Sequence, residues 1–205
     1  MQVVWEKFCQ LWQIELRQVP LTREKRTLCP KEALKHCDEN TICIVPIAGV
    51  TWTGLNDDIE ALDKELDEFN KRTGYNIPIH VDAASGGFIL PFVSPETKWD
   101  FRLKWVASIS TSGHKFGLVY PGLGWVVWRD KSMLPEEMSF SVNYLGAEVT
   151  QVGLNFSRPA AQVLGQYYNF IRLGREGYTR VQQNSMEIAR YCHKRIGEME
   201  CFENY

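Results

Sequence analysis

Apolar side chains recur along the chain with two spacings, one typical of helices and one of buried strands. Val4, Phe8, Leu11 and Trp12 follow the helical spacing and predict that the chain opens inside a helix. A short helix is expected over residues 31–37, directly after Pro30, because proline fits the first turn of a helix.

The clearest amphipathic pattern begins at Asn56, which we predict to cap a helix whose first turn is acidic. Gly74 is expected to end this helix. Two more helices are expected near the end of the chain, over residues 159–173 and 178–199. The buried face of the helix after Asn56 is predicted to comprise Ile59, Leu62, Leu66 and Phe69.

Residues 41–48 form an almost unbroken apolar run, which predicts a strand buried on both faces, as in a parallel sheet. Shorter strands are expected over residues 14–16, 78–82, 106–110 and 124–129. Because strands alternate with helices, the pattern predicts an α/β fold with a mainly parallel or mixed central sheet flanked by helices. No composition shift marks an internal domain boundary.

Composition narrows the classes of function. The 205 residues include 23 Lys and Arg against 25 Asp and Glu, a balance unlike that of domains that bind nucleic-acid phosphates. No apolar run is long enough to span a membrane, and no secretion signal is visible at the start. The six cysteines form no C-x-x-C pair and keep no zinc-like spacing to the histidines, which favours reduced structural thiols and no metal site.

Candidate chemistry follows three of the predicted strands, at residues 49–54, 80–87 and 110–117. In open α/β sheets, ligands bind beyond the carboxyl ends of the strands. Asp82 either caps the next helix or pairs with a cationic ligand atom. Lys115 is expected to be buried, where a lysine loses its charge easily and attacks aldehydes.

Together these residues predict a pyridoxal phosphate site. That cofactor needs a lysine for its aldehyde, an acid against its pyridine nitrogen, and donors for its phosphate. Lys115 and Asp82 supply the first two parts, and Ser112 with His114 supplies the third. Ser85, Gly86 and Gly87 are expected to shape the turn after Asp82 rather than to contact substrate.

The sequence resembles the pyridoxal-phosphate-dependent amino-acid decarboxylases, in particular the glutamate decarboxylases. The resemblance covers almost the whole chain, and its longer strings point to the glutamate enzymes. It is carried by DENTI (38–42), HVDAASGGF (80–88), WDFR (99–102), STSGHKFG (110–117), NFSRP (155–159) and RLGREGY (172–178).

The resemblance implies an aspartate-aminotransferase-like (fold type I) large domain, incomplete at both ends. Residues 1–205 would form the central part of this cofactor-binding domain. Segments before Met1 and after Tyr205 would supply the group that stacks on the other ring face, the residues for the substrate's distal carboxylate and a small C-terminal domain. The uncapped helix at the start of the chain agrees with this expectation.

The resemblance also implies a role for each site residue. Lys115 holds the cofactor's aldehyde as an imine, Asp82 pairs with the pyridinium nitrogen, and Ala84 packs on one ring face. Thr51 lies near the ring oxygen and the reacting carboxylate. Ser112 and His114 reach the phosphate, and Ser157 reaches a phosphate across a dimer interface. The catalytic candidates are thus Lys115, Thr51 and His114.

The implied reaction is decarboxylation of L-glutamate to 4-aminobutanoate and carbon dioxide by a cytoplasmic homodimer or higher homo-oligomer. Two alternatives remain open. One is decarboxylation of another amino acid, such as tyrosine or tryptophan. The other is a non-catalytic fragment that serves only as a scaffold or binds a partner.

Overall fold

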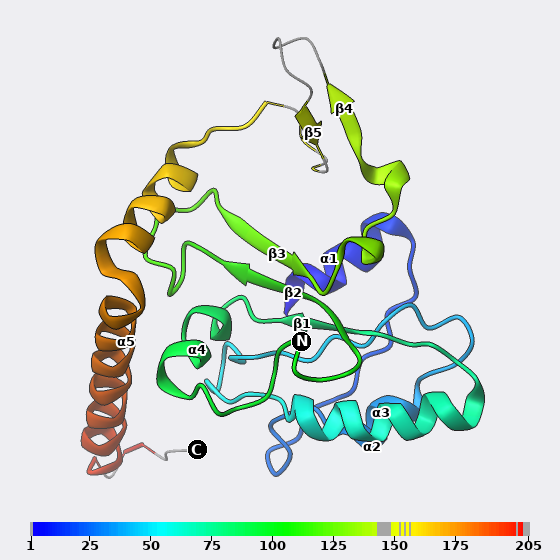
Figure 1. The fold of residues 1–205 in the computed structure, drawn as a ribbon. Helices are drawn as coiled ribbons and strands as arrows, with labels where there is room; N and C mark the ends of the chain where they lie inside the picture. The colour runs from blue at the N-terminus through cyan, green and yellow to red at the C-terminus, as the bar shows by residue number, and fades with distance from the viewer. Residues whose placement is uncertain are drawn as a thin grey trace.

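The computed structural model describes residues 2–142, 149–151, 153, 155, 157–199 and 201–202; Met1, Phe156 and Tyr205 lie outside them. Its centre is a three-stranded sheet in the order β1 (Ile79–Asp82), β2 (Val106–Ser112) and β3 (Gly124–Trp128) (Figure 1). β1 and β2 are parallel, and β3 is antiparallel to β2. The sheet is therefore mixed, and the three predicted strands are confirmed.

Side chains of β1 and β2 alternate between the two faces of this sheet. Ile79 and Val81 are fully buried in the core, where they meet α3 (Ile59–Thr73). On α3, Ile59, Leu62 and Leu66 are buried as predicted, and Phe69 is partly buried against the same core. This helix therefore covers one face of the sheet, with α2 (Pro30–Lys35) beside it (Figure 1).

The ends of α3 follow from local chemistry. Gly74 ends the helix in the left-handed conformation, as predicted, with φ of 79°. The predicted cap at Asn56 is wrong: the capping residue is Asp58, whose carboxylate accepts a hydrogen bond from the Ala61 amide. The carboxylate of the preceding Asp57 turns inward and accepts hydrogen bonds from the amides of Leu28 and Ile47.

The helix predicted at the start of the chain is α1 (Val3–Trp12), which lies against the opposite face of the sheet (Figure 1). None of its residues is fully buried, and the predicted apolar stripe of Val4, Phe8, Leu11 and Trp12 is exposed. The side chains that turn inward are those of Trp5 and Cys9, which lie one helical turn apart.

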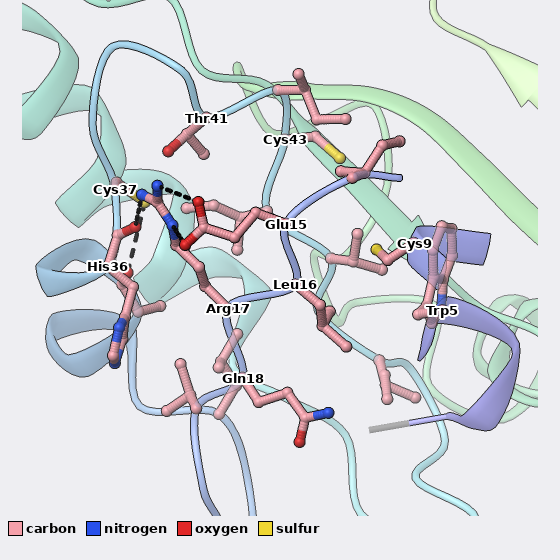
Figure 2. A pocket seen from close by; sticks show the side chains of 18 of the residues that line it. Trp5, Cys9, Glu15, Leu16, Arg17, Gln18, His36, Cys37, Thr41 and Cys43 are labelled. Atoms are coloured by element: carbon pink, nitrogen blue, oxygen red, sulfur yellow. Dashed lines mark hydrogen bonds and ion pairs between the residues drawn. The ribbon is translucent and has the colours of Figure 1, made fainter. Parts of the chain in front are cut away.

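Two predicted strands are not formed as strands. Residues 41–48 run parallel to β1 but make only isolated bridges, Ile44 to Ile79 and Ile47 to Asp82. Pro46 lies between these bridges and has no N–H to continue a ladder. Residues 14–16 form no strand among the described residues and instead line a cavity (Figure 2).

The remaining elements are peripheral. The short helix α4 (Leu90–Val93) contacts α5 (Ala161–Gly197), and β4 (Phe140–Val142) pairs antiparallel with β5 (Val149–Gln151) away from the main sheet. α5 spans both helices predicted after residue 159, and the break expected between them is a kink at Gly174. No helix in the described part of the chain is long and apolar enough to cross a membrane.

Candidate active site

The candidate site lies at the carboxyl ends of β1 and β2, where the parallel strands bring Asp82 opposite Ser110. Asp82 is the last residue of β1 and is only 3% exposed. Its Oδ1 accepts a hydrogen bond of 3.1 Å from the Ala84 amide. The Ala84 carbonyl in turn accepts one of 3.2 Å from the Ser112 amide. Asp82, Ala84 and Ser112 are thus joined directly.

The loop that carries Thr51 reaches the same edge. The Ala48 amide donates to the Asp82 carbonyl, and the Gly86 amide donates to the Ala48 carbonyl, each over 2.9 Å. Gly49 has φ of +90°, and a Cβ there would lie 2.9 Å from the Ser85 Cβ, so only glycine fits this close approach. Thr51, an exposed residue, follows two residues later.

Lys115 lies in the turn after β2, and its Nζ donates to the Ser85 hydroxyl over 3.4 Å. The expectation that Lys115 is buried is wrong: this turn is open to solvent, and both Lys115 and His114 are exposed. The interpretation of Ser85 as a turn residue alone was incomplete, because its hydroxyl is the polar partner that the structure gives to the Lys115 amine.

The predicted phosphate ligands are only partly brought together. Ser112 ends β2 and His114 follows in the turn, two residues apart, both at the strand edge. Ser157 is exposed before α5, and no contact within the described residues ties it to this cluster. The predicted role of Ser157 requires a second subunit, so a single chain does not test it.

Sequence reasoning overlooked the side chain of Trp5, which contacts this site. The Trp5 Nε1 donates to Asp82 Oδ2 over 2.7 Å. The ring of Trp5 packs edge-on against His80, with the ring centroids 5.2 Å apart. The signal was available, since Trp5 and Cys9 lie one helical turn apart, beside the stripe that was considered.

His80 connects the two parallel strands beneath this site. Its Nδ1 lies 2.7 Å from the Ser108 hydroxyl and its Nε2 lies 3.1 Å from the Ser110 hydroxyl. Burial lowers the pKa of His80, and the nearby negative charge of Asp82 only partly opposes that shift. The imidazole is therefore held neutral, with one ring nitrogen donating and the other accepting.

A cavity of about 410 Å³ lies behind Trp5, between residues 14–19 and residues 41–45 (Figure 2). Its walls are mainly apolar and include Cys9, Cys37 and Cys43. Burial raises the pKa of the Cys43 thiol to about 11, so this sulfur stays protonated near neutral pH. All six cysteines are free, and no cluster of potential metal ligands occurs in the described part of the chain.

The side chains at the strand edge fit pyridoxal phosphate by their chemistry. Lys115 offers an exposed amine whose hydrogen bond to the Ser85 hydroxyl is a long one. Asp82 offers a buried carboxylate that accepts hydrogen bonds from the Trp5 indole and the Ala84 amide. These two bonds leave further lone pairs of the carboxylate unused. Ser112 and His114 offer hydroxyl and imidazole groups suited to a phosphate.

Comparison with known proteins agrees with this donor set. The model of the pyridoxal-dependent decarboxylase conserved domain matches residues 1–204. The chain is 53% identical to a glutamate decarboxylase of Lactococcus lactis subsp. cremoris over 202 residues, which is 98% of this chain and 43% of that protein. The chain thus spans less than half the length of the curated relatives it matches.

Solved structures show the same relationship. A glutamate decarboxylase of Lactobacillus brevis superposes with a TM-score of 0.91 and 50% identity, over 95% of this chain and 44% of that one. A sphingosine-1-phosphate lyase of Burkholderia pseudomallei superposes with a TM-score of 0.81 and is 27% identical in sequence. That match covers 97% of this chain and 45% of the lyase. These neighbours confirm the predicted fold class, the aspartate-aminotransferase-like (fold type I) large domain.

Proposed function

The chain belongs to the family of pyridoxal-dependent decarboxylases, and we propose that the protein containing it decarboxylates L-glutamate. The bond between Cα and the α-carboxylate breaks, carbon dioxide leaves, and a proton takes its place at Cα to give 4-aminobutanoate. The observation that carries the choice of glutamate is the 53% identity to a glutamate decarboxylase over 98% of the chain. Family membership also confirms the predicted cofactor, pyridoxal phosphate.

Three residues of the strand edge hold the cofactor ring in this proposal. Lys115 binds the aldehyde carbon through its amine, and Ser85 orients that amine. Asp82 pairs its carboxylate with the protonated pyridine nitrogen, and Ala84 packs against one ring face. When bound, the cofactor supplies the electron sink that carbon–carbon cleavage requires.

The other residues bind phosphate and substrate. Ser112 donates a hydrogen bond to the cofactor phosphate from the end of β2, and His114 donates one from the turn that follows. Thr51, an exposed residue, places its hydroxyl near the ring oxygen and the reacting carboxylate. These contributions consist of position and preorganised polarity, which is how a protein assists cofactor chemistry.

Ser157 completes the phosphate site of a second subunit, so the proposed protein is a homodimer or a larger homo-oligomer. The start of α5, a few residues after Ser157, exposes Val163, Leu164, Tyr167 and Tyr168, an apolar surface suited to a second copy of the chain. We place the protein in the cytoplasm, because free cysteines persist in that reducing compartment. Light scattering of the purified protein measures the oligomeric state, and a monomer would exclude this role for Ser157.

Cofactor attachment provides the first test. The purified protein is incubated with pyridoxal phosphate, reduced with borohydride and mapped by mass spectrometry. The label is expected on Lys115, absent in Lys115→Ala, and unchanged in Lys131→Ala, which removes another exposed lysine, one that follows β3. A label spread over surface lysines would contradict the proposal and would favour a scaffold function.

Substrate choice provides the second test. Release of labelled carbon dioxide is measured with L-glutamate, L-tyrosine and L-tryptophan under the same conditions. Turnover of glutamate is expected to exceed that of both aromatic substrates by at least about a hundredfold, since a pocket built for a polar group rejects analogues that lack it. Faster turnover of an aromatic amino acid would establish the alternative decarboxylase activity.

A further inference from the structure

The carboxylate of Asp82 accepts one hydrogen bond from the indole of Trp5 and another from the protein backbone. Trp5 Nε1 donates to Oδ2 over 2.7 Å, and the Ala84 amide donates to Oδ1 over 3.1 Å. The two donors belong to segments about 80 residues apart in the sequence, α1 and the loop after β1. Each oxygen of the carboxylate therefore has its own fixed partner.

Two hydrogen-bond donors, one on each oxygen, restrain the Asp82 carboxylate more than a single donor does. A single hydrogen bond leaves the carboxylate free to rotate about its Cβ–Cγ bond, whereas one donor on each oxygen fixes its plane. Asp82 is 3% exposed, and within the described residues it forms no ion pair. A buried carboxylate without partners is costly, so the Trp5 N–H stabilises the charge as well as its direction.

The position of Trp5 is supported by a ring contact and by the attachment of α1 to the strand edge. Its ring packs edge-on against His80, which is hydrogen-bonded to Ser108 and Ser110 of β2. One turn earlier, the Gln2 side-chain amide donates to the Thr51 hydroxyl and ties the start of α1 to the strand edge. Trp5 also lines the cavity behind the site, where Figure 2 shows it beside Cys9.

We propose that Trp5 is a positioning residue, whose indole N–H sets the plane of the Asp82 carboxylate for the pyridine nitrogen of the cofactor. A carboxylate offers about four lone-pair positions, so two remain after the Trp5 and Ala84 bonds. The role of Asp82 toward the cofactor rests on the proposed function, whereas the Trp5–Asp82 contact does not.

The contact is tested first without cofactor, by nuclear magnetic resonance of the protein with ¹⁵N-labelled tryptophan. Trp5→Phe identifies the indole resonance of Trp5 by its loss. Asp82→Asn is expected to shift that resonance and to speed its exchange with solvent, because a neutral amide oxygen accepts more weakly than a carboxylate. The resonances of the other tryptophans serve as internal controls. An unchanged Trp5 resonance would overturn the proposal.

Cofactor affinity is tested second, by titrating pyridoxal phosphate and following the visible absorbance of the bound form. Trp5→Phe keeps an aromatic ring but removes the N–H, and we expect about tenfold weaker binding together with a shifted band. Trp12→Phe is the matched control, because it makes the same change on the same helix at a side chain that is 61% exposed. Trp12→Phe is expected to bind the cofactor as the parent protein does.

A double-mutant cycle separates positioning from general damage to the fold. If Trp5 acts through Asp82, adding Trp5→Phe to Asp82→Asn changes affinity less than about twofold. Equal losses in both backgrounds would assign Trp5 a merely structural role. Tighter binding by Trp5→Phe would show that the indole competes with the cofactor for Asp82, and that too would overturn the proposal.

The outcomes for Trp5 and for the proposed function are distinct. A parent protein that binds the cofactor on Lys115, loses affinity in Trp5→Phe, yet releases no carbon dioxide from glutamate would refute the proposed function and support the role of Trp5. A protein that turns over glutamate with unchanged affinity in Trp5→Phe would do the reverse. Absence of any cofactor binding would refute both.

Discussion

The amine of Lys115 donates a hydrogen bond to the hydroxyl of Ser85 over 3.4 Å, which joins the turn after β2 to the loop after β1. The contact spans two strand ends that the parallel pairing of β1 and β2 brings side by side. It gives the amine a preferred direction while leaving its lone pair available after deprotonation.

Removing this hydroxyl should slow cofactor attachment without preventing it. A neutral hydrogen bond contributes about 1 kcal/mol, and a long one contributes less, so Ser85→Ala is expected to lower the attachment rate by about two- to fivefold. Stopped-flow absorbance after mixing with pyridoxal phosphate measures the rate. Lys115→Ala, which removes the amine, should abolish the signal; a Ser85→Ala protein that is equally inactive would mean that Ser85 does more than orient Lys115.

Asp57 is expected to be a strong contributor to stability. It is 9% exposed, and its two oxygens accept hydrogen bonds of 2.7 Å from the Leu28 and Ile47 amides. Asp57→Ala leaves both amides without partners and should destabilise the fold by about 2–4 kcal/mol, measured by urea unfolding. The adjacent Asp58→Ala removes only a helix cap and should cost about 1 kcal/mol. Equal losses in the two variants would contradict this account.

Gly87 is required by space rather than by backbone angle. A Cβ at this position would lie 2.5 Å from the Thr111 Oγ1 and 2.7 Å from its Cβ. Gly87→Ala should therefore push the turn after β1 away from β2 and destabilise the fold by about 1–3 kcal/mol. Gly165→Ala is the control. Gly165 lies in α5, and a Cβ there would lie 3.8 Å from Val119, an ordinary contact distance, so this change should stabilise the fold by up to about 1 kcal/mol. Thermal unfolding ranks the two variants.

His80 should make stability depend on pH. Because burial lowers its pKa in the folded protein, the unfolded chain binds the proton first, below its pKa of about 6.5. Stability is thus fully present above that value and falls as the pH drops through the folded pKa. His80→Gln should flatten this part of the curve in urea titrations at several pH values. A parent protein whose stability rises on acidification through this range would refute the assignment.

Local chemistry made much of the fold predictable. The helix α3 and strands β1, β2 and β3 were predicted because apolar spacing, an acidic first turn and Gly74 act over a few residues. The break between the two final helices was expected and appears as the kink at Gly174. Residues 14–16 and 41–48 were mispredicted because a strand needs a hydrogen-bonded neighbour, which no local pattern can guarantee.

Some features of the candidate site were likewise predictable from the sequence, and others were not. Asp82, Ser112, His114 and Lys115 were identified from their positions after apolar runs, and the structure brings these runs to one edge. The exposure of Lys115 and its contact with Ser85 were not foreseen, since both depend on how two loops meet. Trp5 was missed for the same reason, because helical spacing gives α1 two apolar stripes and does not say which one turns inward.

The sequence alone determined the kinds of group available: one acid, one amine and small polar donors, each directly after an apolar run. It also determined the α/β class, because the spacing of apolar residues is a local property. That the sheet is mixed rather than mainly parallel was decided by the strand pairing. Only the tertiary structure decided the partners of those groups, namely Trp5 and Ala84 for Asp82 and Ser85 for Lys115. Hydrogen bonds require atoms within about 3 Å of one another, and that proximity arises from strand pairing and helix packing between distant segments.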